Sequence, residues 1–387
     1  MAPHIYLDHA ATTPVRAEVL EAMTPFFGAR FGNPSSVHRW GRDARTALDE
    51  ARSRVAACLR AQPDEIVFTS GGTEGDNLAI LGPWHMRRAQ GRNAVVTTPT
   101  EHKAVLEVVH QVAREGGEER ILPVNAQGEI PQASLDAMLD DAVAVCSVMW
   151  INNETGVVQD VPAIGARARA VGALMHTDAV QAFGKLPIDV TSLPVDLLSL
   201  SGHKIGAPKG IGAIYIRRGT PFAPLFHGGS QDRGRRPGTE NVAFAVALAV
   251  AAEMQLAERE AECARLGAMR DALQGAILAR VPDAVVHGVN ATQRAPHILS
   301  ISVPGTDSES LLMALDLAGI AASGGSACQS GSVSPSHVLS AMGVSRSLAG
   351  AAVRLSVGML TTDADIARVS EVFPAMVEKA RRLAGAA

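Results

Sequence analysis

Residues 195–209 read VDLLSLSGHKIGAPK, and the rest of the chain is best understood from this stretch. Residues 195–200 are a short apolar run, which predicts a buried parallel strand. The run breaks into Ser201-Gly202-His203-Lys204, so we expect the strand to end in a small-residue turn that carries one lysine. A lysine beside apolar surface and a cationic or phosphorylated partner can lose its proton and form a Schiff base. Because a lone lysine is usually solvated in a surface loop, Lys204 becomes a candidate only with other motifs.

The bulk composition narrows the class of protein. The 387 residues are 47% hydrophobic and 19% charged, with a formal net charge of −4. This length predicts one large and one smaller domain, and the charge provides no basic field for nucleic acid. The N-terminus lacks a signal-peptide pattern and no apolar run reaches membrane-spanning length, so we expect no membrane partner and a cytoplasmic location. The four cysteines show neither a CxxC pair nor metal-ligand spacing, so no disulfide framework is predicted.

Apolar runs alternate with helical patterns over the first two thirds of the chain. The runs lie at 65–69, 93–98, 142–151, 173–176, 195–200 and 210–216. This alternation predicts a doubly wound, mainly parallel sheet of the α/β class. Helices are expected at 42–59, from the turn at 70–74 to residue 81, and at 104–115, and a long one is expected at 243–281, leading out of the first domain. Further on, we expect strands at 297–303 and 353–358 and helices at 308–318 and 363–384.

Polar motifs follow several of these predicted strands. They are SGGTE at 70–74, EH at 101–102, NNETG at 152–156 and TDAVQ at 177–181. The carboxyl ends of parallel strands face the crevice where such sheets bind ligands. The strand–glycine turn–helix at 70–74 offers backbone N–H groups to an anion, although a plain turn is equally common. His102 alone would more often be a packed or surface residue. The glycine- and arginine-rich residues 226–241 predict an exposed, anion-friendly loop at a subunit contact.

Two residues stand out chemically in the last quarter of the chain. Cys328 lies among Ser, Gly and Gln in a stretch expected to be exposed, which favours a reactive thiol over a structural one. Cys58 and Cys146, in contrast, lie in a predicted helix and a predicted strand and are interpreted as packed thiols. Arg354 lies in an apolar strand and therefore needs an anion, either a substrate carboxylate or an internal aspartate or glutamate.

Taken together, these motifs resemble the cysteine desulfurases of the NifS/IscS type, within the fold-type I (class V aminotransferase) pyridoxal-phosphate enzymes. The resemblance covers nearly the whole chain and follows the family order. The matching strings are YLDHAATTP (6–14), GNPSSVH (32–38), SGGTEGDN (70–77), EHKAV (101–105), NNETG (152–156), DAVQ (178–181), SGHKIGAPKG (201–210), RPGTENV (236–242), GSAC (325–328) and RLSVG (354–358).

The resemblance implies a fold and a cofactor. The expected fold has a large domain with a mainly parallel seven-stranded sheet (15–255) and a smaller α+β domain formed by 1–14 and 256–387, which carries a mobile cysteine loop. Pyridoxal 5'-phosphate would be held by Lys204 as an aldimine. Asp178 would pair with the pyridinium nitrogen, Gln181 would bind the phenolic oxygen and His102 would stack on the ring. The phosphate would be bound by Gly72, Thr73, Ser201 and His203, and by Thr239 of a neighbouring subunit.

The resemblance also implies the reaction. L-cysteine would be bound by Asn153 and Arg354, and converted to L-alanine. Lys204 would move the Cα proton, His102 would assist acid–base chemistry at the substrate thiol, and Cys328 would take the sulfur as a persulfide. A homodimer is implied, with a sulfur acceptor or an iron–sulfur scaffold protein as the partner. No resident metal is expected, and any cluster contact at Cys328 would be transient.

The chain departs from the family pattern in small ways. Residues 323–328 read SGGSAC where SSGSAC is common, and Ser230 and Asp232 replace a frequent Gly and Glu. The chain also lacks the longer C-terminal extension with which some members engage a scaffold protein, which leaves the acceptor open. Two rival interpretations remain: a related lyase acting on selenocysteine or cysteine sulfinate, and a non-enzymatic assembly protein on a decayed enzyme scaffold. Neither rival requires Lys204, Asp178, His102 and Cys328 together.

Overall fold

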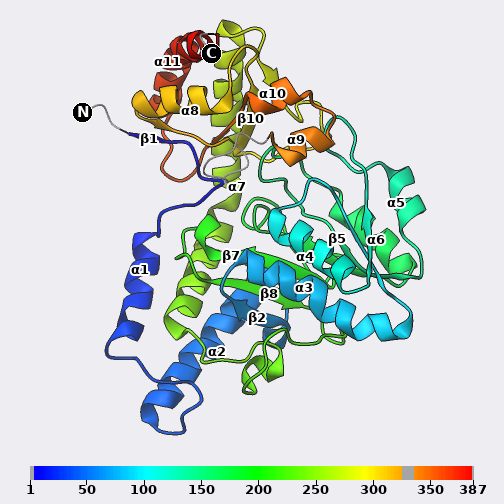
Figure 1. Ribbon diagram of the computed structural model, residues 1–387. Coiled ribbons are helices and arrows are strands. Elements are labelled where there is room, and N and C mark those ends of the chain that lie inside the picture. Colours follow the sequence, from blue (N-terminus) through cyan, green and yellow to red (C-terminus); the bar gives the residue numbers. More distant parts are fainter. Residues whose placement is uncertain (1–3, 325–334, 386–387) are drawn as a thin grey trace.

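The computed structural model describes residues 4–324 and 335–385, and its main element is the predicted α/β sheet (Figure 1). Seven strands are ordered β2-β8-β7-β6-β5-β3-β4, and only β8 runs antiparallel to its neighbours. The seven-stranded, mainly parallel sheet is therefore confirmed. Its strands are β2 (Ile66–Thr69), β3 (Ala94–Thr97), β4 (Glu118–Ile121), β5 (Val143–Ser147), β6 (Leu174–Asp178), β7 (Leu197–Ser201) and β8 (Gly212–Ile216).

Strand β7 confirms the expectation for residues 195–200. All five of its residues are buried, because it lies between β6, to which it is parallel, and β8. A strand covered on both faces is mostly apolar, and this accounts for the three leucines of the run LLSL. Since β3, β5, β6 and β7 are parallel, the polar residues that follow them meet at one edge of the sheet.

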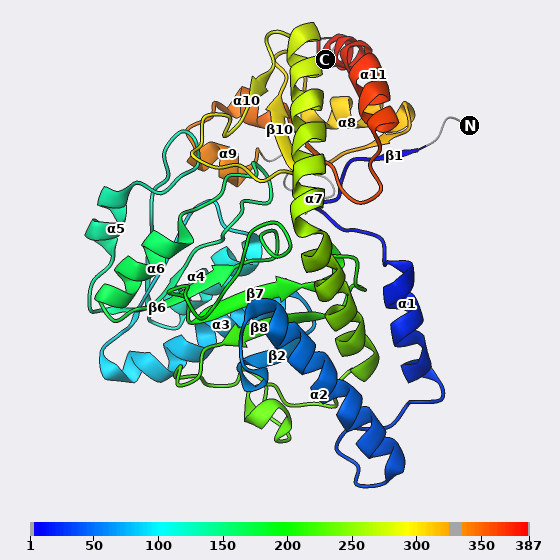
Figure 2. The same ribbon diagram turned by 180° about the vertical axis from the view of Figure 1, so that it is seen from behind.

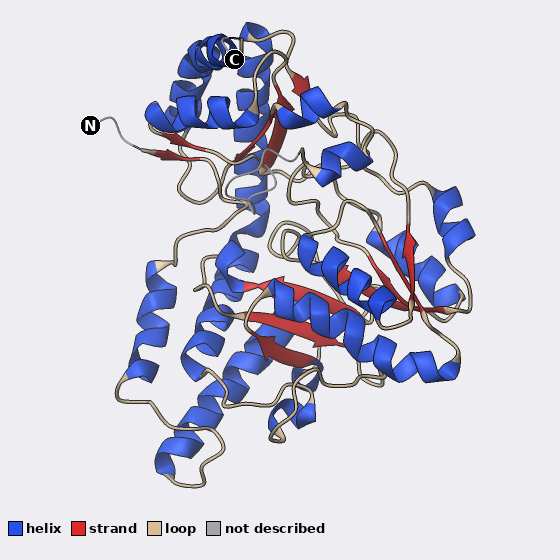
Figure 3. Ribbon diagram, in the orientation of Figure 1, coloured by secondary structure: helices blue, strands red, loops and turns tan. Residues whose placement is uncertain are grey.

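Helices cover both faces of this sheet, as Figures 1 and 3 show. Helices α3 and α4 cover one face, where they contribute Ile80, Trp84 and four valines to a buried cluster with β3 and β5. Helices α1, α2, α6 and α7 pack over the other face in the largest core. The helices of this part are α1 (Ala17–Met23), α2 (Arg39–Leu59), α3 (Gly72–Arg87), α4 (Lys103–Arg114), α5 (Gln132–Met138), α6 (Val161–Ala170) and α7 (Val242–Arg280).

Helix α7 joins this part of the molecule to a smaller one. Its 39 residues run from beside the sheet of the large part to the far end of the smaller part, as Figure 2 shows from behind. Its first third, from Val242 to Ala252, contributes buried residues to the large core, whereas Leu266, Met269, Leu273 and Ile277 belong to a second core. The domain boundaries given above remain a prediction, and the existence of two separate cores supports them.

The smaller part is built around two short sheets. The order β12-β10-β9 is antiparallel, and β1 pairs in parallel with β11. Residues of the N-terminal β1 thus pack with the C-terminal third of the chain. The elements are β1 (Ile5–Tyr6), β9 (Val285–Val286), β10 (Ile298–Ser302), β11 (Ile320–Ala321), β12 (Ala352–Ser356), α8 (Ser308–Leu317), α9 (His337–Ala341), α10 (Arg346–Gly350) and α11 (Asp363–Ala384).

The structure adds elements that the apolar pattern did not predict. Strand β4, with the sequence EERI, lies at the edge of the sheet and is only partly buried, so it lacks an apolar run. Helices α1, α5, α6, α9 and α10 are short, at ten residues or fewer. Helix α3 continues through Pro83 to Arg87, beyond the predicted end at residue 81. Among the helices of residues 4–324 and 335–385, none has the length and apolarity that crossing a bilayer requires.

Candidate active site

A cavity of about 290 Å³ lies at the carboxyl edge of the sheet, and we call it the active-site cavity. Ten of the twelve predicted site residues line it, although they come from positions between 72 and 354. The remaining two are Thr239 and Cys328. The lining consists of Ala10, Ala11, Gly72, Thr73, Asp76, His102, Lys103, Met149, Asn153, Glu154, Asp178, Val180, Gln181, Ser201, His203, Lys204, His337 and Arg354.

Lys204 lies in a single 3-10 turn, η4 (Gly202–Lys204), directly after β7. Its Nζ donates hydrogen bonds to the carbonyl oxygens of Ala10 and Ala11, each at 2.6 Å. The N-terminal segment thus crosses from the small part to hold the lysine at the cavity wall. An amine held by two backbone carbonyls has a defined position, as a Schiff-base lysine requires.

Asp178 ends β6 on the floor of the cavity and is almost fully buried. Its Oδ1 accepts a hydrogen bond from the N–H of Val180 at 2.8 Å. Burial raises the pKa of its carboxyl, whereas the nearby His102 and Lys204 lower it. A buried carboxylate in this position favours a cationic or N–H partner inside the cavity.

Gln181 lies one turn further along and is fixed by two hydrogen bonds. Its Nε2 donates to the carbonyl of Ala10 at 2.9 Å, and its Oε1 lies 3.2 Å from Nε2 of His297. A carbonyl only accepts, so Ala10 fixes which end of the amide is nitrogen. The amide therefore has one orientation at the cavity wall.

Four residues form a cradle for an anion at one end of the cavity. Helix α3 begins at Gly72, and Thr73 follows in its first turn. A Cβ at Gly72 would lie 2.8 Å from Cγ2 of Val180, so the backbone approaches closely only because the residue is glycine. Ser201 and His203 add side chains from the end of β7 and from η4. The N–H groups of a helix N-terminus together with polar side chains suit a phosphate.

His102 caps the N-terminus of α4 from the cavity side. Its Nδ1 accepts a hydrogen bond from the N–H of Ala104 at 3.1 Å. This bond requires Nδ1 without a proton, so the neutral ring carries its proton on Nε2. Burial lowers the pKa of His102, and only the charge of Asp178 opposes this effect. The ring is therefore neutral near pH 7 and can exchange a proton at Nε2.

The sequence left open whether Arg354 pairs with an internal acidic residue or binds a substrate carboxylate, and its position allows both. It is 3% exposed, and its NH2 forms an ion pair with Oδ1 of Asp8 at 2.7 Å. Its NH1 donates to the carbonyl of Asn153 at 2.7 Å, and its Nε has no partner among the described residues. The guanidinium is thus held by an internal carboxylate and also lines the cavity beside Asn153, where it can bind a second anion.

We expect Arg354→Lys to raise the KM for an amino-acid substrate about ten- to hundredfold, with a smaller change in kcat. Lysine cannot reproduce the planar fork, and it cannot contact Asp8, Asn153 and a substrate carboxylate together. Steady-state kinetics with L-cysteine measures the effect. Arg368→Lys, at an exposed position of α11, is the matched control. An unchanged KM in a variant with wild-type thermal stability would contradict a carboxylate-binding role.

The other two predicted site residues are Thr239 and Cys328. Thr239 is exposed and does not line the cavity of its own chain, so its role across a subunit contact stays a prediction. Cys328 lies outside the described residues.

Burial raises the pKa of the Cys146 thiol to about 12 and that of Cys58 to about 11. Cys146 is fully buried, which confirms its interpretation, whereas Cys58 is only half-buried against the main core.

The arginine-rich loop 226–241 is largely neutralised within the chain itself. Arg233 forms an ion pair with Asp64 at 2.9 Å, and Arg236 forms one with Glu74 at 2.9 Å. Asp232 pairs with Arg52 at 2.7 Å. The expectation of an anion-friendly surface was therefore too simple, because acidic partners distant in the sequence lie against these arginines.

Sequence reasoning did not find the other carboxyl groups near Asp178. Asp76 is 1% exposed and lines the cavity, and its Oδ1 has no hydrogen-bond partner among the described residues. Glu101 is fully buried and accepts hydrogen bonds from the N–H of Met149. Burial raises the pKa of both carboxyls, that of Glu101 to about 8, and the charge of Asp178 contributes. For Asp76, which is buried on α3, the signal was an acidic residue at a helix position that an apolar residue normally occupies.

These residues fit pyridoxal phosphate. The helix start with Gly72, Thr73, Ser201 and His203 suits the phosphate, and the buried carboxylate of Asp178 suits a protonated ring nitrogen. Lys204 supplies the amine that the aldehyde requires. Within the described residues, no group of three or more His, Cys, Asp or Glu side chains is placed to hold a metal ion.

The chain resembles known proteins over nearly its full length. The profile of the family described as Aminotransferase class-V matches residues 5–369. The chain is 45% identical to a cysteine desulfurase of Trichormus azollae over 98% of its length and 94% of the relative's. It is 45% identical to the cysteine desulfurase NifS of Azotobacter vinelandii, with the same coverage, and 42% identical to the cysteine desulfurase IscS of Dictyoglomus turgidum over 99% and 97%.

Solved structures give the same result. A structure named NifS-like protein superimposes with a TM-score of 0.90 at 33% identity, covering 97% of this chain and 99% of the other. A structure of SspA in complex with cysteine has a TM-score of 0.80 at 33% identity, with 91% and 98% covered. The site geometry, the fold and the full-length similarity agree, and the chain belongs to the class V aminotransferase family, among the cysteine desulfurases of the NifS/IscS type.

Proposed function

We propose that this chain converts L-cysteine to L-alanine and passes the sulfur to Cys328, with pyridoxal phosphate as its cofactor. The observation that carries the proposal is that Lys204, Asp178 and Arg354 share one cavity. They provide an amine, a buried carboxylate and a carboxylate-binding guanidinium. The names of the relatives support the substrate, as does the complex of SspA with cysteine. When bound, the cofactor would withdraw electrons from the substrate's Cα and so allow its proton to leave.

The chain's own residues would bind and orient the amino acid. Arg354, already fixed by Asp8, would take the substrate carboxylate, and Asn153 would contact the same group. With its carboxylate bound in this way, the substrate would present its Cα to Lys204. Asp178 would keep the ring nitrogen protonated, because its buried charge is stabilised by a positive neighbour.

Proton transfer and sulfur transfer would then be divided between three side chains. Lys204 Nζ, once released by the substrate amine, would accept the Cα proton. His102 Nε2 would accept the proton of the substrate thiol. The Cys328 thiolate would attack the substrate sulfur, so that an S–S bond forms as the C–S bond breaks. The electron pair of the C–S bond would stay with carbon, which takes up protons to become the methyl group of alanine.

We further propose that the enzyme is a homodimer. Residues 17–40 form α1, the following turns and the start of α2, at the lower left of Figure 1. Large apolar side chains of this segment are exposed: Leu20, Phe27, Phe31, Val37 and Trp40. A group of this kind marks an association surface. Thr239, which is exposed in its own chain, would reach the phosphate cradle of the other subunit. The sulfur acceptor and a cytoplasmic location stay predictions from the sequence.

The test of the function is product formation. Purified protein with pyridoxal phosphate should form alanine and sulfide in equal amounts from L-cysteine and a thiol reductant. Selenocysteine and cysteine sulfinate are the comparison substrates. Turnover of either of these without turnover of L-cysteine would favour the rival lyase. A protein that neither binds the cofactor nor forms product would favour the non-enzymatic alternative.

A further inference from the structure

A second, much smaller cavity of about 30 Å³ lies directly behind the active-site cavity, and we call it the rear cavity. Val180, Gln181 and Lys204 line both cavities and therefore form part of the wall between them. The other walls come from the N-terminal segment, the turn after residue 181, α7 and the small part. They are His9, Thr13, Arg16, Phe183, Lys185, Ile205, Gln255, Glu262, Leu266, His297, Val357, Gly358 and Met359.

Several buried polar atoms of this lining have no hydrogen-bond partner among the described residues. They are both ring nitrogens of His9, Nδ1 of His297 and Nε of Arg16. His9 and His297 are each 4% exposed. An unpaired buried polar group loses its hydrogen bonds to water without replacement, so a group that satisfies several of these atoms at once is strongly favoured. The described protein atoms do not provide it.

The hydrogen bonds at Gln181 determine which proton His297 carries. The Gln181 Nε2 donates a hydrogen bond to the Ala10 carbonyl, so the amide nitrogen points toward Ala10. The amide oxygen, Oε1, therefore points toward His297. An amide oxygen only accepts, so His297 Nε2 must be the donor. In a neutral ring the other nitrogen, Nδ1, is then an acceptor that needs a donor from the rear cavity.

Both histidines are neutral near pH 7. Burial lowers the pKa of His9 to about 4, and it lowers that of His297 well below its usual value. The charge of Lys185 lowers both, whereas Glu262 acts in the opposite direction on His9. A neutral His9 offers one donor and one acceptor. The partner that fits these two rings must itself both donate and accept, as water does.

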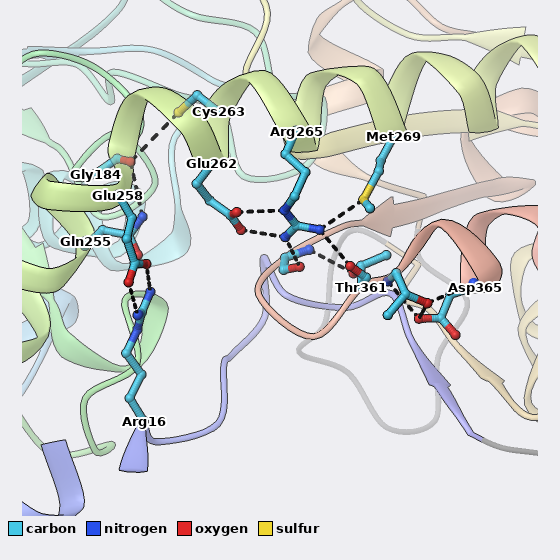
Figure 4. A network of polar contacts seen from close by, with 12 residues as sticks. Arg16, Gly184, Gln255, Glu258, Glu262, Cys263, Arg265, Met269, Thr361 and Asp365 are labelled. Atoms are coloured by element: carbon cyan, nitrogen blue, oxygen red, sulfur yellow. Dashed lines mark hydrogen bonds and ion pairs between the residues drawn. The ribbon is translucent and has the colours of Figure 1, made fainter. Parts of the chain in front are cut away.

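The ring of His9 has little freedom to find another partner. A Cβ at Gly358 would lie 2.2 Å from its Cγ, so the ring packs directly on the glycine backbone. The ring of Tyr6 meets it edge-on with 4.9 Å between centroids. The Gly358 loop is itself tied to α7, because Arg265 donates to the carbonyls of Gly358 and Thr361 (Figure 4). The geometry of the rear cavity is therefore well defined.

We infer that the rear cavity holds buried water bound to His9 and to Nδ1 of His297, and that this water and the two histidines position Gln181. A water that donates a hydrogen bond to Nδ1 of His297 keeps the ring proton on Nε2. The Nε2–H group then donates a hydrogen bond to Oε1 of Gln181. The second amide hydrogen of Gln181 then remains for a group in the active-site cavity. This inference rests on the function proposed above, in which that group is the phenolic oxygen of pyridoxal phosphate. His9 and His297 are positioning residues and have no contact with substrate.

The first test follows the visible absorption of lysine-bound pyridoxal phosphate as a function of pH. An N–H donor at the phenolic oxygen stabilises its negative charge and favours loss of the neighbouring imine proton. His297→Leu should therefore raise the midpoint pH of the spectral change by about half a unit, because Gln181 loses its fixed orientation. His297→Gln retains an N–H donor at similar reach and should restore a midpoint close to that of wild type.

Two controls separate positioning from a general structural effect. His287 is equally buried, at 4% exposed, and pairs with Ser302 away from both cavities, so His287→Leu should leave the midpoint unchanged. In a Gln181→Ala background, His297→Leu should cause no further shift, because the residue through which it acts is gone. Equal shifts in His297→Leu and His297→Gln, or additive shifts in the double variant, would overturn the inference.

The second test needs neither cofactor nor activity. A crystal structure of the wild-type protein, without pyridoxal phosphate and at a resolution that shows ordered water, should contain density within hydrogen-bond distance of His297 Nδ1 and a ring nitrogen of His9. An empty rear cavity would overturn the inference even if the enzyme is an active desulfurase. Conversely, water in the cavity of a protein that never binds pyridoxal phosphate would refute the proposed function and retain the water site.

Discussion

Replacing Lys204 by alanine is expected to lower the rate of alanine formation from L-cysteine by on the order of a thousandfold or more. The lysine is the only proposed group that both bonds the cofactor and moves the Cα proton. Its Nζ is already held at the cavity wall by the carbonyls of Ala10 and Ala11. The variant should also lose the visible band of lysine-bound pyridoxal phosphate. Absorption spectra and a coupled alanine assay measure the two effects.

The matched control is Lys209→Ala. Lys209 lies five positions further on in the same glycine-rich turn, but its side chain is exposed and does not line the cavity. This variant should retain both the band and the rate. Wild-type turnover in Lys204→Ala would show that the reaction does not use this amine, and would remove the central residue from the proposed mechanism.

Cys328→Ala is expected to abolish persulfide formation and to reduce sulfide release from L-cysteine to the background of the assay. The thiolate is the proposed acceptor of the substrate sulfur, and alanine has no nucleophile to replace it. Cofactor binding should be unchanged, because all the residues proposed to hold the ring belong to other segments. Persulfide labelling followed by mass spectrometry identifies the modified cysteine directly.

Cys263→Ala serves as the control for this variant. Cys263 lies on α7, half-buried, and donates a weak hydrogen bond to the carbonyl of Lys185 at 3.4 Å. Burial raises the pKa of its thiol, which makes it a poor nucleophile. Its loss should leave sulfide release intact. Full sulfide release from Cys328→Ala would instead support the lyase chemistry that needs no persulfide-bearing cysteine.

The individual site motifs were predictable because each lies where a strong local signal ends. A run of apolar residues followed by glycine, serine or aspartate marks the end of a buried strand, and Asp178, Ser201 and Lys204 all follow such runs. Parallel strands bring these ends to one edge. The order of the motifs along the chain carried the family resemblance. The alternation of apolar runs and helical patterns alone would have predicted only an α/β protein.

Edge and junction elements were less predictable, because their residues have mixed surroundings. Strand β4 carries charged residues at a sheet edge, so no alternation or apolar run marks it. The pairing of β1 with β11 joins segments more than 300 residues apart, with the register Ile5 to Ile320. Two-residue strands of this kind form because the second core closes around them, and local propensity contributes little.

The sequence by itself determined the α/β class, the succession of strands and helices and the chemical groups available to the site. Only the tertiary structure decided how these groups are paired. It showed that Arg354 is held by Asp8, that Gln181 is fixed between Ala10 and His297, and that acidic residues neutralise the arginine-rich loop. The physical reason is that periodicity reports which residues are buried, whereas pairing depends on distances between segments that meet only when both cores have formed.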